Sequence, residues 1–305
     1  MPVKFGYCVE APMGWPDMLR LARELDTNSN FDSFWIGDSL LPNGPPDDPK
    51  LEAWTALAAI AQATSRLRLG LRVSGNAFRH PSVLAKIVTT IDHISGGRVE
   101  LGIGAGWPGE HRRFGIDFWR RKERLERFDE AVHVIKLLWT EPRPKFQGKY
   151  YSLDEPPYEP ANIQKPHPPI VVGGGSDPTL PVMAKYADVA TPMILLADAR
   201  PKVEAHCREI GRDPSEIRWS GGGMLFLNDD PAVQQRAVEF AKREYGSSEE
   251  ETRKGIFGSA ADVAAGVQRQ IDEGYSEVVV FQLPRVHASS LMRFSDEVIP
   301  QFAHD

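Results

Sequence analysis

Acidic residues and one histidine stand where short apolar runs of this sequence end. Glu10 and Asp38 each follow such a run, and Glu110 and His111 lie in a polar stretch after a later run. A buried carboxylate can have a raised pKa suited to proton transfer, and histidine exchanges protons near neutral pH. These four residues are therefore the candidate catalytic residues. The alternative is that the carboxylates only hydrogen-bond the backbone, which we favour for Glu110, and that His111 is solvated.

Three other run ends are rich in glycine and other small residues, which let a flat ligand approach the backbone. They are Ser-Gly-Asn at 74–76, Gly-Ala-Gly-Trp at 104–107 and Gly-Gly-Gly-Ser at 173–176. A helix is predicted to begin just after the glycine triplet, and its free N–H groups could bind a phosphate. A tight strand-to-helix turn explains the triplet equally well.

The elements that must position these residues alternate along the chain. Short apolar runs are each followed by a helix-like stretch, which is typical of βα units with a parallel sheet. In a barrel of such units the active site forms at the carboxyl ends of the strands, where the candidate residues stand. We therefore predict an α/β protein, a single (β/α)8 TIM barrel domain over 1–305. Its expected strands are 3–9, 32–37, 67–74, 99–105, 169–173, 188–191, 217–227 and 277–283.

Apolar residues three and four positions apart predict helices over 83–94 and 125–139. Ser82 is expected to cap the first of them. A third helix is expected over 260–273, with Ser259 as its N-cap and Gly274 at its end.

Two long stretches interrupt the alternation and predict insertions after strand 4 and before strand 5 of the barrel. They cover 107–119 and 143–169, and loops of this length in a compact domain are often functional. Within the second, 146–151 is expected to form a small hairpin.

Arg72 is an unexpected charge inside a predicted strand. Side-chain alternation places it toward the barrel axis, and Glu100 on the next strand faces the same way. Because an unpaired buried charge is costly, we expect an Arg72–Glu100 ion pair.

Composition narrows the class of partner. A net charge of -6 disfavours a nucleic-acid binder and leaves a small-molecule substrate as the expected partner. Cys8 and Cys207 lie far apart, which suits a cytoplasmic protein without a structural metal. No apolar run reaches the roughly 18 residues of a membrane span, so no membrane association is expected.

Basic residues gather between 111 and 127 in this acidic chain. They could attract an anionic cofactor tail or substrate. We favour a solvated helix face, with Glu123 and Arg127 paired four residues apart.

Several motifs together resemble the luciferase-like monooxygenase family over nearly the whole chain. The most specific are Leu-Arg-Leu-Gly at 67–70, Gly-Asn-Ala-Phe-Arg-His-Pro at 75–81, Ser-Gly-Gly-Arg at 95–98 and Leu-Gly-Ile-Gly-Ala-Gly-Trp at 101–107. Further matches are Phe-Asp-Ser-Phe-Trp at 31–35, 146–151, and Pro-His-Pro-Pro-Ile at 166–170 before the glycine triplet.

This resemblance implies a TIM-type barrel that binds FMN or coenzyme F420, a deazaflavin, at the carboxyl ends of its strands, often as a homodimer. It also implies a cis peptide at Ser74–Gly75, supporting the cofactor ring from behind. The resemblance also assigns the contacts with the cofactor ring and with its phosphate to particular residues. The implied cofactor-binding residues are Asp38, Ser74, Gly75, Asn76, Ala105, Gly106, Gly173, Gly174, Gly175 and Ser176.

The segments at 75–81 and 104–107 look most like members that use F420, so F420-dependent hydride transfer to or from a small organic substrate is the preferred function. One alternative is a monooxygenase that uses reduced FMN from a separate reductase and inserts one oxygen atom. Another is a non-catalytic flavin-binding protein. Ser39 stands where several deazaflavin dehydrogenases carry histidine, and Trp107 where some carry glutamate. A sugar-phosphate dehydrogenase is therefore not predicted.

Overall fold

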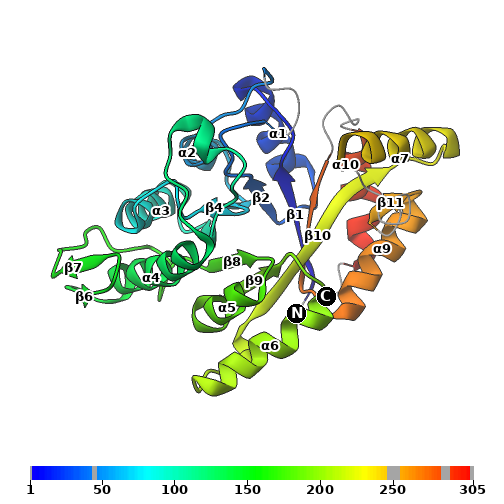
Figure 1. Ribbon diagram of the computed structural model, residues 1–305. Helices are drawn as coiled ribbons and strands as arrows, with labels where there is room; N and C mark the ends of the chain where they lie inside the picture. The colour runs from blue at the N-terminus through cyan, green and yellow to red at the C-terminus, as the bar shows by residue number, and fades with distance from the viewer. Residues whose placement is uncertain (1, 43–46, 246–254, 283–288, 303–305) are drawn as a thin grey trace. The chain divides into compact units, whose positions relative to one another are not determined.

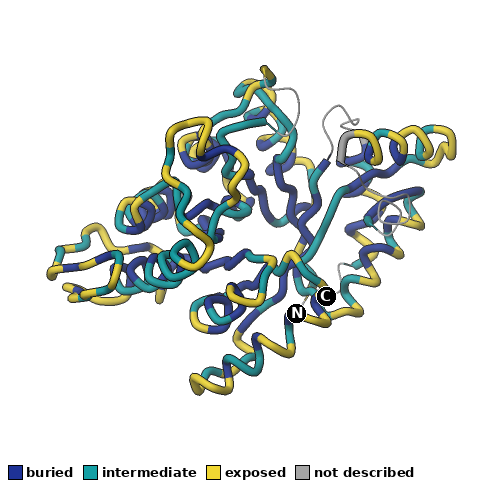
Figure 2. Tube along the Cα trace, viewed as in Figure 1, coloured by how far each residue is buried: buried dark blue, intermediate teal, exposed yellow. Residues whose placement is uncertain are grey.

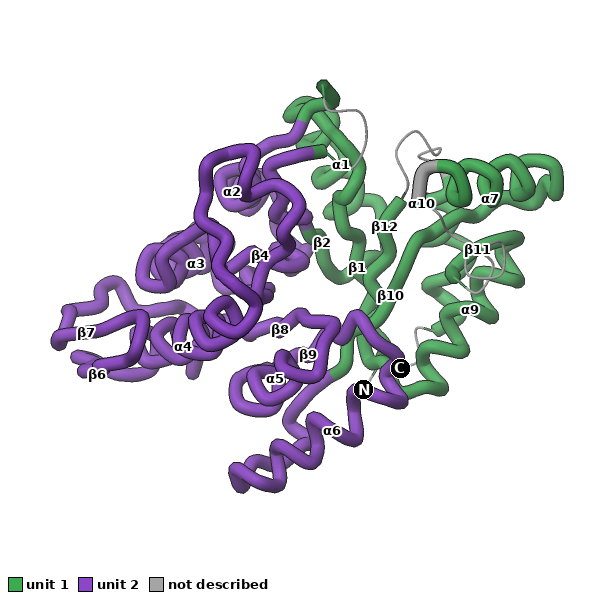
Figure 3. The backbone as a smooth tube through the Cα atoms, in the orientation of Figure 1, with its two compact units in different colours: residues 1–35, 42–49, 219–305 green, residues 36–41, 50–218 purple. Residues whose placement is uncertain are grey.

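The computed structural model describes residues 2–42, 47–245, 255–282 and 289–302 (Figure 1). They fall into two compact units (Figure 3). Unit 1 comprises 1–35, 42–49 and 219–305, and unit 2 comprises 36–41 and 50–218. None of the helices in these described ranges is both long and apolar enough to cross a membrane.

Unit 1 is a sheet of mostly buried strands with helices. Its strands are hydrogen-bonded in the order β11 (Ile256–Gly258), β10 (Arg218–Leu227), β12 (Glu277–Phe281), β1 (Lys4–Val9) and β2 (Ser33–Ile36). The pairs β10–β11, β10–β12 and β1–β12 are parallel. Its helices are α1 (Trp15–Asn28), α7 (Pro231–Tyr245), α9 (Ala260–Glu273) and α10 (Ser289–Arg293), the last leading into irregular turns over 294–302.

Unit 2 carries the other strands, and apart from the two strands of an antiparallel hairpin they are in parallel register. The order is β3 (Arg68–Leu71), β5 (Val99–Gly104), β8 (Ile170–Gly174) and β9 (Val189–Pro192), and the two-residue β4 (Ser74–Gly75) also pairs with β5. Every residue of β5 is buried. Figure 2 shows the buried stretches of the chain in dark blue. The helices are α2 (Ala53–Ala63), α3 (Pro81–Ser95), α4 (Arg121–Thr140), α5 (Leu180–Tyr186) and α6 (Leu196–Glu209), with short 3-10 turns η1 (His111–Phe114), η2 (Asp177–Thr179) and η3 (Pro214–Glu216).

All eight predicted strands are present, with ends shifted by a few residues. The third is split into β3 and β4, because the chain leaves strand geometry at residues 72–73. β11 is a further strand that its three-residue length hid from sequence periodicity. The predicted last residue of the eighth strand, Leu283, lies outside the described residues.

The predicted helices form, but one predicted cap is wrong. α3 begins at Pro81, and His80 is its N-cap, accepting the Ser82 N–H at 3.2 Å. Ser82 cannot cap because proline favours the first helical position and keeps the residue before it extended. At α9 the prediction is confirmed, since the Ser259 hydroxyl accepts from the Asp262 N–H and Gly274 ends the helix at φ 101°.

The predicted hairpin at 146–151 is confirmed and is attached to a helix. β6 (Lys145–Gln147) pairs antiparallel with β7 (Ser152–Asp154). The Glu130 carboxylate on α4 accepts the backbone N–H groups of the turn at 149–151, at 2.9, 2.9 and 3.1 Å. The other long stretch, between β5 and α4, contains η1.

Two predictions about the third strand are wrong. Glu100 pairs with Arg68, and Arg72 instead donates to the Thr191 hydroxyl at 2.8 Å, so the expected Arg72–Glu100 pair does not form. The split of the strand breaks the side-chain alternation on which that prediction relied. The non-proline cis peptide is Arg72–Val73 rather than Ser74–Gly75.

Candidate functional site

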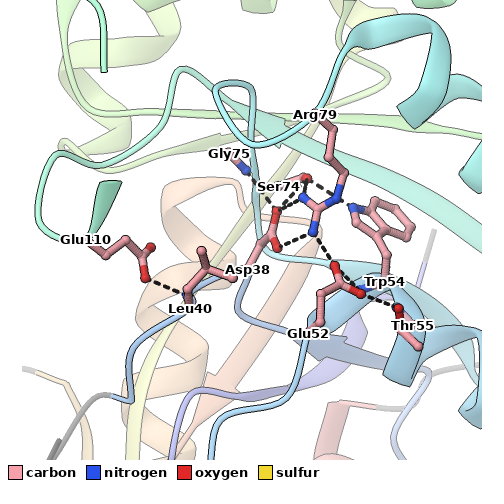
Figure 4. A network of polar contacts seen from close by, with 9 residues as sticks. All are labelled: Asp38, Leu40, Glu52, Trp54, Thr55, Ser74, Gly75, Arg79 and Glu110. Carbon is pink, nitrogen blue, oxygen red and sulfur yellow. Dashed lines mark hydrogen bonds and ion pairs between the residues drawn. The ribbon is translucent and has the colours of Figure 1, made fainter. Parts of the chain in front are cut away.

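Asp38 is the centre of a buried polar network in unit 2 (Figure 4). Its side chain is only 2% exposed. Its Oδ2 accepts from the Ser74 hydroxyl at 2.7 Å and from the Gly75 N–H at 3.2 Å. The carboxylate therefore fixes the backbone and side chain of β4, which immediately precedes the glycine-rich stretch.

Arg79, two residues before α3 begins, forms an ion pair with the same carboxylate. Its two terminal nitrogens donate to Oδ2 and Oδ1 of Asp38 at 2.7 and 3.1 Å. It also pairs with Glu52, which caps α2 by accepting the Thr55 N–H at 2.7 Å. Burial alone would lower the pKa of Arg79, but Asp38 and Glu52 outweigh burial and raise it. Arg79 thus has a structural pairing with two carboxylates.

Ser74 is held from a second side by an aromatic residue. The indole N–H of Trp54 on α2 donates to the Ser74 hydroxyl at 3.1 Å, and both residues are buried. Glu52 and Trp54 were missed by sequence reasoning. The signal for Glu52 was local, because an acidic residue just before an apolar helical run is a favourable N-cap.

Glu110 holds the loop that follows Asp38. Its buried Oε2 accepts from the Ser39 hydroxyl at 2.8 Å and from the N–H groups of Leu40 and Leu41 at 2.5 and 2.9 Å. The backbone hydrogen bonding considered for this residue is thus what the structure contains. Ser39, where the family resemblance pointed to a possible histidine, connects the segment of Glu110 to the loop that follows Asp38.

His111 is fully buried, so the solvated alternative was wrong. Its ring lies parallel to Phe78, with centroids 4.4 Å apart and 1° between planes, and meets Phe118 at 4.6 Å. Burial lowers the pKa of His111, against the favourable effect of Glu110 on the charged form. The Trp107 backbone lies near enough to act on this pKa, yet among the described residues no group reaches either ring nitrogen with hydrogen-bond geometry.

Two glycines from separate parts of the chain meet beside these aromatic rings. A Cβ added to Gly75 would lie 3.8 Å from the Gly106 Cα and 3.0 Å from the Phe78 ring. Gly106 has φ +92°, which side-chain-bearing residues rarely adopt, and a Cβ added there would lie 3.5 Å from the Phe118 ring. These predicted cofactor residues are therefore brought together, with Ala105 next to Gly106 at the end of β5.

Asn76 follows the close approach of the two glycines. Its backbone N–H donates to the Gly104 carbonyl at 3.0 Å, while its side chain is 2% exposed. Within the described part of the chain neither atom of its amide has a hydrogen-bond partner in good geometry, although the Tyr151 hydroxyl lies close enough for Asn76 to act against the rise of its pKa. A buried polar amide without a partner is costly, which marks it as a group that a ligand can satisfy.

The glycine triplet is explained largely by packing. A Cβ on Gly173 would meet Val73 at 2.9 Å, one on Gly174 would meet Thr179 at 2.3 Å and one on Gly175 would meet Met193 at 2.9 Å. Ser176 precedes η2, and its carbonyl accepts the Thr179 N–H at 2.8 Å. Packing in a tight turn thus accounts for the three glycines. The feature that still favours a phosphate site is the set of backbone N–H groups at the start of η2.

Glu10 belongs to unit 1, whereas the other candidate catalytic residues belong to unit 2. It follows β1 and accepts a contact from the Cys8 thiol at 3.4 Å. Asp38, Glu110 and His111 are brought together in unit 2. Across the ranges that the structure describes, no cluster of three or more His, Cys, Asp or Glu side chains is arranged to hold a metal ion.

Comparisons with known proteins agree on one family. Its model, described as luciferase-like monooxygenase, matches residues 4–279. A relative from Kineococcus radiotolerans, named F420-dependent glucose-6-phosphate dehydrogenase, is 28% identical over 98% of this chain and 97% of its own length. Another relative, the FMNH2-dependent dimethylsulfone monooxygenase of Pseudomonas putida, is 27% identical over 61% of this chain and 55% of its own length.

Solved structures confirm the predicted fold class, a (β/α)8 barrel. An F420-dependent secondary alcohol dehydrogenase superposes with a TM-score of 0.81 over 99% of this chain and 98% of its own, at 20% identity. The F420-dependent tetrahydromethanopterin reductase of Methanopyrus kandleri gives a TM-score of 0.78 over 99% of this chain and 100% of its own, also at 20% identity.

Proposed function

The chain belongs to the luciferase-like monooxygenase family, and on that basis we propose that it is an oxidoreductase that binds coenzyme F420 and transfers hydride to or from a small organic substrate. The relative from K. radiotolerans, matched over nearly its full length, and the two superposed dehydrogenase and reductase structures support the deazaflavin. When bound, the deazaflavin supplies the hydride chemistry. The residues of this chain supply binding, orientation and exclusion of water.

The observation that carries the proposal is the approach of Gly75 to Gly106 beside the buried amide of Asn76. Two backbone segments without Cβ atoms leave a flat surface against which a ring system can pack. The Asn76 amide has both a donor and an acceptor, and in the described residues only the Tyr151 hydroxyl lies near it, so it suits the polar edge of such a ring. Ala105 extends the same small-residue surface.

We assign Asp38 and Ser74 to positioning within this cofactor site. Both oxygens of Asp38 are engaged by Arg79, and one also holds the Gly75 N–H. An ion pair this well enclosed keeps the backbone of Gly75 in place without a cost at the moment of binding. The network therefore preorganises the surface that meets the ring.

The phosphate end of the cofactor is assigned to residues 173–176. Ser176 precedes the 3-10 turn η2, and the first N–H groups of such a turn have no partner within it. N–H groups without a partner at the start of a helical turn favour a phosphate. Gly174 and Gly175 let the turn lie against Thr179 and Met193, which sets the direction of those groups.

We assign proton exchange with the substrate to a candidate whose polar atoms are not already hydrogen-bonded to other groups of the protein. Asp38 is engaged through both oxygens, and Glu110 is engaged through Oε2 by the loop at 39–41. His111 has no such commitment, and a neutral imidazole can donate at one nitrogen and accept at the other. His111 is therefore the preferred group for proton exchange, whereas Glu10, which accepts from the Cys8 thiol, stays a prediction of the sequence.

A reduced-FMN monooxygenase is the second candidate function, because the P. putida relative is named for that activity. It would require a reductase to supply reduced FMN. Under either function we propose a cytoplasmic homodimer with a small-molecule substrate. A sugar-phosphate substrate is not proposed, because Ser39 and Trp107 replace the histidine and glutamate of the dehydrogenases, and Trp107 is 71% exposed.

Oxygen consumption separates the two functions. The purified protein would be supplied with reduced F420, or with reduced FMN and a reductase, in an oxygen electrode together with a panel of small ketones, alcohols and sulfones. Hydride transfer predicts F420 oxidation that depends on a ketone and proceeds at the same rate without oxygen. Oxygen uptake that depends on reduced FMN and on one of the substrates would replace the F420 proposal with the monooxygenase.

A further inference from the structure

We propose that Arg124, the N-terminal end of α4 and the buried His111 form a binding site for an anionic group, a carboxylate or a phosphate, carried by the small molecule handled in unit 2. The proposal deepens the proposed function and rests on it only for the identity of that molecule. The sequence pattern favoured a solvated helix face for this basic region, and the contacts of two residues in it argue otherwise.

Arg124 is a partly buried cation, and the acidic residues next to it in the helix form ion pairs with other cations. Its Nε is buried and has no acceptor among the described residues, and no carboxylate of those residues lies within ion-pair distance. Glu123 pairs with Arg127 at 2.8 Å, as the sequence predicted, and Glu126 pairs with Lys149 at 2.7 Å. Burial, together with the like charge of Arg121, lowers the pKa of Arg124. A guanidinium in this state gains from an anion that no described side chain provides.

The end of α4 adds positive charge to the same place. The helix begins at Arg121, and its N-cap Arg120 makes no side-chain capping hydrogen bond. Helix N-termini carry partial positive charge and unpaired N–H groups, so cations there are unfavourable and anions are favourable. Arg120, Arg121, Lys122 and Arg124 all lie at this end, and the one acid of the first turn, Glu123, is committed to Arg127.

His111 provides the second, independent observation. It is 0% exposed, and among the described residues no group reaches either ring nitrogen in hydrogen-bond geometry, although the Trp107 backbone lies near. Leaving a buried donor and acceptor without well-placed partners is unfavourable, so this buried imidazole needs an explanation. Because burial lowers the pKa of His111, the ring is neutral and can donate one N–H to an anion while keeping its other nitrogen as an acceptor.

One aromatic ring joins the two groups. The Arg124 guanidinium lies over the Phe118 ring at 4.3 Å from its centroid, and the His111 ring lies 4.6 Å from the same centroid. The charge of Arg124 is close enough to act on the pKa of His111. A Cβ added to Gly106 would lie 3.5 Å from the Phe118 ring, so the site adjoins the small-residue surface assigned to the cofactor. An anionic group bound here would belong to a molecule that also reaches that surface.

The test uses benzoate and inorganic phosphate as probes, with benzamide as the neutral analogue, titrated calorimetrically into the full chain at constant ionic strength. The variants are Arg124→Gln and His111→Phe, the latter keeping a ring between Phe78 and Phe118. Arg113→Gln is the matched control, because Arg113 is exposed and lies in the same segment. Circular dichroism would establish that each variant is folded.

We expect wild-type protein to bind at least one anion and to bind benzamide much more weakly. Arg124→Gln and His111→Phe should each weaken anion binding about tenfold or more, the loss typical of a charge-assisted hydrogen bond, while Arg113→Gln should not. Parallel titration with F420 identifies the source of the anion in the cell. If Arg124→Gln also weakens F420, the site takes the anionic part of the cofactor; if only benzoate is weakened, it takes a carboxylate of the substrate.

Three results would overturn the proposal: no anion binding by the wild type, equal binding by wild type and Arg124→Gln, or an equal loss in Arg113→Gln, which would show only long-range charge. Failure of F420 to bind, with benzoate binding intact and sensitive to Arg124→Gln, would defeat the proposed cofactor and leave the anion site standing.

Discussion

Arg79 holds Asp38 through two hydrogen bonds, from its terminal nitrogens to Oδ2 and Oδ1 at 2.7 and 3.1 Å. The carboxylate is 2% exposed and the guanidinium 14% exposed, so the pair is enclosed rather than solvated. Since the same carboxylate accepts the Gly75 N–H, the pair connects the start of α3 to the backbone assigned to the cofactor ring. Ligand binding and stability should therefore respond together when the pair is broken.

Arg79→Met should lower the free energy of unfolding by about 3–5 kcal/mol, because it leaves the Asp38 carboxylate buried without its partner. Cofactor affinity should fall as well, since Gly75 loses its fixed position. Urea denaturation and F420 titration would measure the two effects. Arg20→Met is the control, because the Arg20–Asp17 pair is exposed, and it should change stability by less than about 1 kcal/mol. An Arg79→Met protein as stable as the control would show that the network has no structural importance.

Glu110→Ala should destabilise the protein by about 2–3 kcal/mol, because the N–H groups of Leu40 and Leu41 and the Ser39 hydroxyl lose their shared acceptor. Glu110→Gln keeps an oxygen acceptor at the same place and should lose less than half as much. Chemical denaturation of both variants tests this. Equal losses would mean that the charge of Glu110, rather than its hydrogen bonds, stabilises the loop.

The buried imidazole of His111 predicts a dependence of stability on pH. Its folded-state pKa is lowered by burial, so the unfolded chain binds a proton more readily as the pH falls below the ordinary histidine pKa of about 6.5. The wild type should therefore lose stability as the pH falls through that range, and His111→Phe should lose less. Burial also lowers the pKa of His80, but that contribution is common to both proteins and cancels in the comparison. Parallel curves of unfolding free energy against pH would contradict this account.

Gly106→Ala tests the small-residue surface. Gly106 and Gly115 both have positive φ, at +92° and +66°, so alanine at either position should cost about 1–2 kcal/mol. Only Gly106 lies beside Phe118 and Gly75, whereas a Cβ on Gly115 would meet nothing within 4 Å. We expect similar losses of stability but weaker F420 binding in Gly106→Ala alone. Equal F420 affinities in the two variants would remove Gly106 from the cofactor site.

The sequence predicted the elements well because their signal is local. Apolar alternation and helical spacing located eight strands and three of the helices, and serine and glycine at the ends of 260–273 located the caps of α9. Ser82 failed as a cap because its immediate neighbour Pro81 already occupies the first helical position. Whether 1–305 is one domain stays a prediction.

Contacts between distant residues were predicted less well, because periodicity does not say which side chains meet. Glu100 pairs with Arg68 instead of the expected Arg72, since the strand that begins at Arg68 ends at Leu71, before Arg72. The burial of His111 depends on two phenylalanines, 33 residues before it and seven after it, that no local pattern links to it. Family resemblance, by contrast, indicated Gly75 and Gly106 correctly as residues of one place, because a shared fold carries such long-range proximity.

The most direct test of the central claim is a competition titration, in which F420 fluorescence is followed as purified protein is added, with and without excess FMN. We expect saturable F420 binding that FMN displaces poorly. Gly106→Ala should weaken this binding, and Gly115→Ala should not. Tight binding of FMN that excludes F420, or no binding of F420 at all, would contradict this expectation.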